Sequence, residues 1–120
     1  MPTAFVLGAA FLFLGVAIGA FGAHALKARL AGDAGKNYQT GVLYHLLHGV
    51  GIVAVGASPE AASSSLVHAA VWLFAAGIVL FSGSLYALSL SGVKKLGAIT
   101  PLGGLAFLAG WALVAIAYIG

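Results

Sequence analysis

The chain contains no cysteine and very little charge. Its 120 residues offer no disulfide, no thiolate metal ligand and no cysteine nucleophile. Only 6% of the residues are charged, five of them basic and two acidic, whereas 62% are hydrophobic. A water-soluble domain of this size needs a more polar surface than this. We therefore expect the lipid bilayer to surround most of the chain.

Four long apolar stretches account for most of the sequence. They cover residues 3–26, 40–57, 66–90 and 100–119. A helix of about 20 residues crosses a hydrocarbon core of ~30 Å, and backbone polar groups in lipid must be paired within the helix. The first stretch is too long for a typical signal peptide, and no lysine or arginine precedes it. The sequence thus predicts an all-α fold: a four-helix transmembrane bundle forming a single domain over residues 1–120.

All lysines and arginines lie in two of the three connections between these stretches. Lys27, Arg29 and Lys36 follow the first stretch, and Lys94 and Lys95 follow the third. By the positive-inside rule both basic connections are predicted to be cytoplasmic and both termini outside. Five dispersed basic residues do not form a nucleic-acid surface, so lipid headgroups are the expected contact.

Glycine is frequent, at 18 residues, and recurs at helical spacing within the stretches. Small residues let neighbouring helix backbones approach closely in a membrane. The positions predicted to serve helix packing are Gly15, Gly19, Gly83, Gly103 and Gly110.

No acidic or basic residue lies at the centre of a stretch, so histidine, tyrosine and hydroxyl side chains are the remaining polar groups there. The predicted polar cluster or ligand site consists of His24, Gln39, Tyr44, His48, Ser82, Ser84, Tyr86 and Thr100. One interpretation is a helix-locking network of neutral His24, Tyr44 and His48. The other is a ligand or proton site.

Metal binding and catalysis find little support. His45 and His48 are three residues apart, but a zinc site needs three or four ligands, so no metal site is predicted. A serine nucleophile needs a base and an orienting group, and the stretches supply no acidic partner. We therefore predict no enzymatic activity and no cofactor. Four aromatic residues are expected to anchor the helices at the membrane interface: Tyr38, Trp72, Trp111 and Tyr118.

Four segments of the sequence resemble the signatures of a bacterial family, domain-of-unknown-function family 423, which is similar to a eukaryotic group of small transmembrane proteins. The segments are residues 19–26, residues 39–42 with Tyr44 and His48, residues 81–86, and residues 100–104 with Phe107, Gly110 and Trp111. The resemblance implies a small multi-pass protein of the bacterial inner membrane and brings no established activity. The residues of the predicted polar cluster fall on the motif positions of this family, whereas His45 lies outside the motifs.

Two hypotheses for function follow. The first is a non-enzymatic structural or accessory membrane component that forms a homo-oligomer or joins a larger complex. The alternative is a conduit for protons or small solutes, or a protein that binds lipid or quinone in a His/Tyr/Ser pocket. A continuous wet cavity would favour the alternative, and a bundle whose polar groups are all bonded internally would favour the first.

Overall fold

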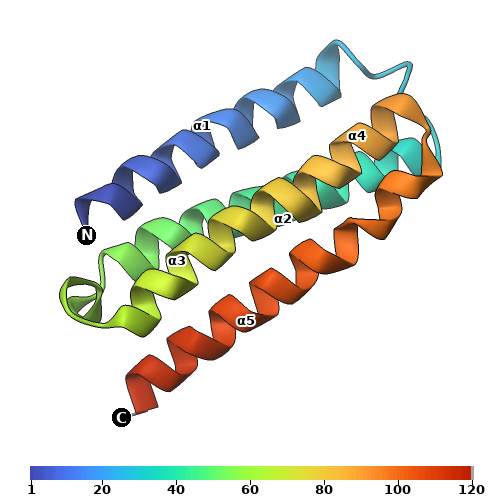
Figure 1. The fold of residues 1–120 in the computed structure, drawn as a ribbon. Coiled ribbons are helices and arrows are strands. Elements are labelled where there is room, and N and C mark those ends of the chain that lie inside the picture. The colour runs from blue at the N-terminus through green and yellow to red at the C-terminus, as the bar shows by residue number, and fades with distance from the viewer. Residues whose placement is uncertain (120) are drawn as a thin grey trace.

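The structure is a computed structural model that describes residues 1–119. Four long antiparallel helical segments lie side by side along an axis of 48 Å (Figure 1). The first two are α1 (Pro2–His24) and α2 (Asp33–Gly56). The third is a continuous run of α3 (Ser65–Gly77), η2 (Ile78–Ser82) and α4 (Gly83–Ser91), and the fourth is α5 (Thr100–Ile119). The short 3-10 turns η1 (Pro59–Ala62) and η3 (Lys94–Ala98) lie in the connections.

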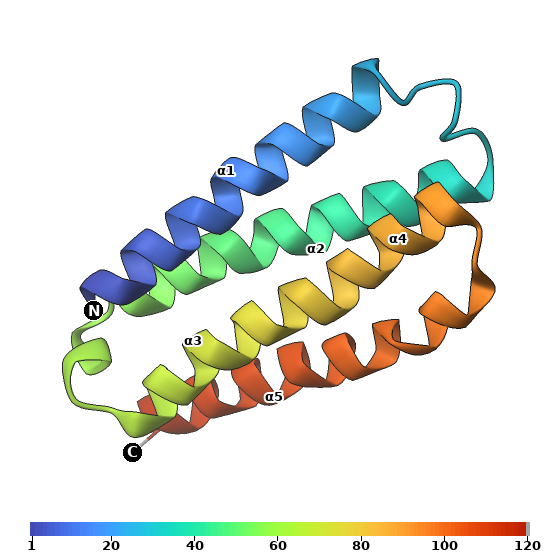
Figure 2. The same cartoon turned by 45° about the horizontal axis from the view of Figure 1, so that its top comes forward.

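The predicted all-α fold of four helices is confirmed, and three of them are long and apolar enough to span a membrane. These three candidate spans are Pro2–His24, Ser65–Ser91 and Lys94–Ile119. α2 is not among them, although it runs parallel to the others over the same length (Figures 1 and 2). Its first two turns are polar, and it buries more residues than any other helix. α2 packs against α1, α3 and α4 and keeps an exposed apolar side that includes Leu43, Leu47 and Val50.

Helix boundaries differ from the expected ones where polar residues continue a helix. α2 begins at Asp33 rather than at residue 40, because its first turns extend the helix beyond the apolar stretch. The third helix includes η2, a five-residue π-helix that the apolar pattern did not predict. The third helix ends at Ser91. The next residue, Gly92, has a φ of 73°, the left-handed conformation typical of a helix C-terminus.

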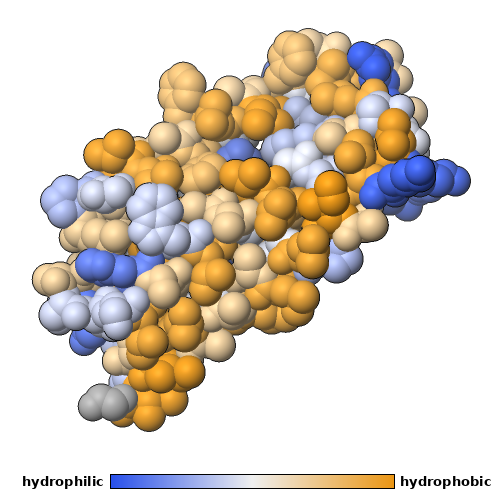
Figure 3. All heavy atoms as spheres, viewed as in Figure 1, coloured by the Kyte–Doolittle hydropathy of each residue, from blue (hydrophilic) through white to orange (hydrophobic). Residues whose placement is uncertain are grey.

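The two ends of the bundle differ in chemistry. Both termini lie at one end, and both basic connections lie at the other (Figures 1 and 2). Arg29 joins the two basic connections by donating from Nη2 to the Leu90 carbonyl at 3.0 Å. Hydrophobic side chains cover the middle of the face seen in Figure 3, and hydrophilic ones gather towards its ends. This distribution matches a helix bundle that crosses a bilayer.

The apolar core lies in the half of the bundle nearer the termini. Phe74, Ile52 and Val71 are fully buried there and pack with residues of α1 and α5. The polar contacts between helices lie nearer the middle and the basic end, which is where the candidate functional residues occur.

Candidate functional site

His45 is the polar side chain that joins most helices. It is 3% exposed on α2. Its Nε2 lies 2.7 Å from the carbonyl oxygen of Phe11 on α1, and its Nδ1 lies 2.8 Å from the hydroxyl of Tyr86 on α4. A carbonyl only accepts, so Nε2 carries the proton and Nδ1 accepts from the tyrosine. One neutral imidazole therefore links three helices.

Glycine makes this contact possible. Gly15 lies one turn after Phe11 on α1, and a Cβ there would come within 3.2 Å of the His45 ring. The missing side chain opens the Phe11 carbonyl to the imidazole. Gly41 lies one turn before His45 on α2. Its carbonyl accepts a hydrogen bond of 2.7 Å from the buried Ser82 hydroxyl of η2.

His48 forms a second centre between α2, α3 and α5. Its Nδ1 lies 2.9 Å from the Tyr44 carbonyl, and the indole Nε1 of Trp111 donates to its Nε2 at 3.0 Å. The Phe107 ring stacks on the imidazole at a centroid distance of 3.6 Å, and Phe74 meets it edge to face at 5.4 Å. Because indole only donates, Nε2 is the acceptor and Nδ1 carries the proton.

The two histidines are thus neutral and in opposite tautomers. Every ring nitrogen has a protein partner, so neither imidazole offers a free lone pair to a metal. Among residues 1–119, no three His, Cys, Asp or Glu side chains lie close enough to hold a metal ion. His45 and His48 therefore form two separate contacts between helices.

Two further predicted hydroxyls, those of Ser84 and Thr100, pair with each other. Ser84 on α4 is buried, and its hydroxyl lies 2.6 Å from that of Thr100 at the start of α5. The same serine lies 2.9 Å from the Phe81 carbonyl. Within the described chain, Glu60 Oε2 is the single buried side-chain nitrogen or oxygen without a hydrogen-bond partner. The hydroxyls of Ser82, Ser84 and Thr100 therefore belong to contacts between helices.

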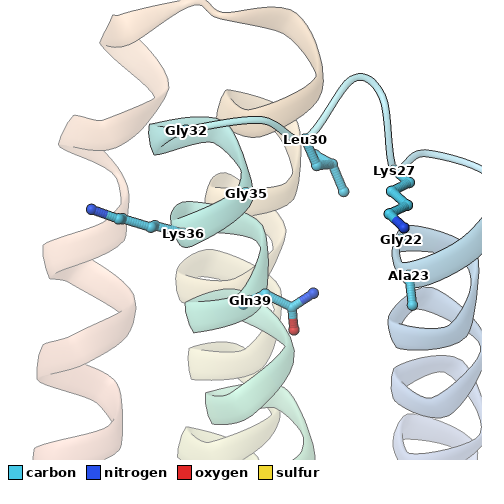
Figure 4. Close-up of a pocket in the computed structure, with 8 residues that line it drawn as sticks. All are labelled: Gly22, Ala23, Lys27, Leu30, Gly32, Gly35, Lys36 and Gln39. Atoms are coloured by element: carbon cyan, nitrogen blue, oxygen red, sulfur yellow. The ribbon is translucent and has the colours of Figure 1, made fainter.

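His24 and Gln39 do not join these contacts. Both are exposed, His24 at the end of α1 and Gln39 near the start of α2. Gln39 lines a hollow of about 470 Å³ between the two helices, together with Ala23 and Lys27 (Figure 4). Because His24 forms no hydrogen bond to Gln39, Tyr44 or His48, the predicted His24–Tyr44–His48 network is wrong. His45 takes the locking role instead.

Tyr44 and His48 line a groove of about 550 Å³ between α2 and α5. Phe81 of η2 and Pro101, Phe107 and Trp111 of α5 complete its sides. The Tyr44 ring packs edge to face on Phe81 at 4.7 Å. Aromatic and aliphatic side chains make up most of the lining of this groove.

One of the predicted interface anchors is an interior residue. Tyr38 is 2% exposed, and its hydroxyl donates to the Ile18 carbonyl of α1. The expectation for Tyr38 is corrected, because its side chain finds a polar partner on a neighbouring helix. Trp111 is 44% exposed, and its indole donates to His48 from a position more than halfway along α5. Trp72 and Tyr118 are also exposed.

Four of the five glycines predicted to serve packing lie against a neighbouring helix. Gly15 and Gly19 of α1 face α2, Gly103 of α5 meets the backbone of Phe81, and Gly110 meets the Phe74 ring. Gly83 differs, because a Cβ there would have no atom within 4 Å. The packing role predicted for Gly83 is therefore wrong.

Comparison with known proteins places the chain in a family. Residues 18–104 match the family described as "Protein of unknown function (DUF423)". The "UPF0382 membrane protein YwdK" of Bacillus subtilis (strain 168) is 44% identical over 118 residues, which cover 98% of this chain and 96% of the relative. The "UPF0382 inner membrane protein YgdD" of Escherichia coli (strain K12) is 39% identical over 104 residues, which cover 87% and 79%. No solved structure matches. The chain therefore belongs to the DUF423 family of small multi-pass proteins of the bacterial inner or plasma membrane.

Proposed function

We propose that the protein is a non-enzymatic structural or accessory component of the membrane. The observation that carries this proposal is the use of its buried polar groups. His45 joins α1, α2 and α4, His48 joins α2 and α5, and Ser84 meets Thr100 at the start of α5. Such interhelical bonds fix the arrangement of a membrane bundle. Groups committed in this way are not free to act on a substrate.

The serine hydroxyls support a role without catalysis. Ser82 donates to a backbone carbonyl, and Ser84 contacts a backbone carbonyl and Thr100. Neither hydroxyl has a histidine as its hydrogen-bond partner, although a serine nucleophile needs a base within reach. The two acidic residues, Asp33 and Glu60, lie at opposite ends of the bundle.

The alternative of a proton or solute conduit is less well supported. A proton path needs groups that can both accept and release a proton along a shared route. Tyr44 and His48 line the α2–α5 groove, whereas Tyr86 is paired with His45 and Thr100 with Ser84. The polar residues named for a conduit are thus divided among separate contacts.

A pair of measurements tests the proposal. The protein is reconstituted into liposomes that contain a pH-sensitive dye, and a pH gradient is applied. We expect proton entry equal to that of protein-free liposomes. Native mass spectrometry after extraction in mild detergent is expected to give a defined homo-oligomer or complex. Proton entry that His48→Ala abolishes would overturn the structural role, and a monomer without partners would overturn the accessory role.

A further inference from the structure

The α2–α5 groove has the length of one membrane leaflet. It runs along α5 from Pro101, near the basic end, to Trp111. Ten residues of helix rise about 15 Å, which is half of a hydrocarbon core of ~30 Å. The groove therefore extends from headgroup level on the basic side to the region of the membrane midplane.

The walls of the groove suit a hydrocarbon chain. Phe81, Leu105, Phe107 and Leu108 line it with apolar surface. His48 adds no free polar atom, because both of its ring nitrogens are bonded to the protein. Phe81 belongs to η2, and π-helical turns occur frequently at functional sites.

One polar group in the groove lacks a protein partner. Tyr38 and Tyr86 bond their hydroxyls to neighbouring helices. Tyr44 is 37% exposed, and its hydroxyl has no hydrogen-bond partner among residues 1–119. A helical side chain leans towards the helix N-terminus, which for α2 is the basic end. A hydroxyl in apolar surroundings requires an acceptor, and the ester carbonyls of a lipid lie at this end of the groove.

Basic residues lie at the end of the bundle where the groove opens. Lys36 lies about two turns before Tyr44 on α2. It is one of the residues that line the hollow beside α1, but its side chain points away from Lys27 (Figure 4). Lys95 lies in η3, which leads directly into α5 and Pro101. Lys94 of the same turn lines a separate hollow that also contains Asp33. All three lysines are exposed. All five basic residues but only one acidic residue, Asp33, lie at this end.

From these observations we propose that the α2–α5 groove binds one anionic phospholipid from the leaflet on the basic side. One acyl chain lies along Phe81, Phe107 and Trp111, and the phosphate lies near Lys36 and Lys95. The Tyr44 hydroxyl donates to an ester carbonyl. This site goes beyond the structural role proposed above and does not depend on it.

Trp111 reports occupancy of the groove directly. In a Trp72→Phe variant it is the single tryptophan, and bromine atoms on a lipid chain quench its fluorescence at short range. The protein is placed in vesicles of one fixed mixture of phosphatidylglycerol and phosphatidylcholine. In one preparation the phosphatidylglycerol is brominated, and in the other preparation the phosphatidylcholine is brominated. We expect brominated phosphatidylglycerol to associate at least about five-fold more strongly, the factor for one lysine at an anionic headgroup.

A second single-tryptophan variant is the matched control. Trp111→Phe leaves Trp72, which is exposed on α3 beside Leu7 and Phe11 of α1. We expect the two brominated lipids to quench Trp72 equally. Equal quenching of Trp111 by the two lipids would overturn the site. An equal preference for phosphatidylglycerol at both tryptophans would also overturn it, because the preference would then belong to the whole surface.

Charge and shape variants separate the two parts of the site. In the Trp72→Phe background, Lys36→Gln is expected to lower the preference for phosphatidylglycerol. Lys27 lines the same hollow beside α1 as Lys36 but lies on the α1 side of it, so Lys27→Gln is expected to leave the preference unchanged. Gly104→Leu fills the groove, and its Cβ would meet Phe81 at an ordinary distance of 3.8 Å. It should therefore reduce quenching by either lipid. An effect of Lys27→Gln equal to that of Lys36→Gln would contradict the assigned headgroup position.

Discussion

His45 joins three helices through two hydrogen bonds, and each partner matches one nitrogen of a neutral imidazole. The Phe11 carbonyl accepts from Nε2, and the Tyr86 hydroxyl donates to Nδ1. Interhelical hydrogen bonds in membranes contribute about 0.6 kcal/mol on average and at most about 1.7 kcal/mol. Because the unfolded helices in a membrane also find partners, the contribution stays modest. What His45 chiefly determines is which faces of α1, α2 and α4 meet.

A double-mutant cycle measures this contact. His45→Phe, Tyr86→Phe and the double variant are unfolded from mixed micelles by titration with sodium dodecyl sulfate. We expect a coupling free energy of about 0.6 to 1.7 kcal/mol between the two sites. Tyr44→Phe is the control, because it removes a hydroxyl that has no protein partner and should change stability by less than about 0.5 kcal/mol. A coupling near zero would mean that the His45–Tyr86 bond does not hold the helices.

The tautomers of the two histidines give a spectroscopic prediction. His48 accepts from the Trp111 indole through Nε2, whereas His45 donates through Nε2 to a carbonyl. Nitrogen-15 NMR of the protein in lipid bilayers should therefore show a protonated Nδ1 in His48 and a protonated Nε2 in His45. Trp111→Phe should shift the Nε2 signal of His48 and leave His45 unchanged. The same tautomer in both residues would contradict these hydrogen-bond assignments.

The spacing of the glycines around His45 is a sequence signal for its contact with other helices. Gly41, His45 and Gly49 recur every four residues, so they share one face of α2, and both glycines are buried contacts. A histidine between two packing glycines is placed to meet a neighbouring helix. The expectation for His24 rests on its place at the end of the first apolar stretch, close in sequence to the second. Which side chains meet across helices depends on helix rotation, and apolar length does not determine that rotation.

At the scale of the elements, the backbones of η2 and α5 lie in direct contact. Gly103 lies against the backbone and Cβ of Phe81, and a Cβ at this position would overlap Phe81. Gly83, immediately after η2, faces open space instead. The two glycines lie in helices of similar apolar character, but only one of them holds helices close together.

Alanine substitutions at these two glycines should have opposite outcomes. Gly103→Ala forces α5 away from η2 and should lower the free energy of unfolding by about 1 to 3 kcal/mol. Gly83→Ala adds a methyl group without a clash and improves helix propensity, so stability should stay within about 1 kcal/mol or rise. Titration with sodium dodecyl sulfate compares the two variants. Equal losses of stability would show that the approach of Phe81 to Gly103 does not limit packing.

The apolar runs predicted the number and order of the helices better than their ends. Helix α5 begins at Thr100 as expected, because Pro101 fixes that boundary. Helix α2 begins seven residues earlier than its apolar run, because Asp33 and the following polar residues form helix outside the hydrocarbon. The π-helix η2 has no signature in hydropathy. Its position depends on contacts with Gly41 and Gly103, which are distant in sequence.

At the scale of the molecule, the four antiparallel helices place both termini at one end and both basic connections at the other (Figure 2). A bundle with an even number of crossings must have its ends on one side. α2 packs against α1, α3 and α4, so its lower hydropathy does not exclude a position in the membrane. The sequence supported this arrangement through charge placement alone. The pairing of α2 with α5 through His48 and Trp111 became visible only in three dimensions.

Charge placement leads to a prediction of orientation. Positively charged connections remain in the cytoplasm, so the connections near Ala31 and Ala98 should be inside and the one near Ser63 outside. The chain has no cysteine, so one introduced thiol is the single reactive site. All three positions are exposed. A membrane-impermeant maleimide applied to intact spheroplasts should label Ser63→Cys and should label Ala31→Cys and Ala98→Cys only after lysis. The reverse pattern would show that the protein has the opposite orientation. Different labelling of Ala31→Cys and Ala98→Cys would contradict four crossings, because four crossings place both basic connections on the same side of the membrane.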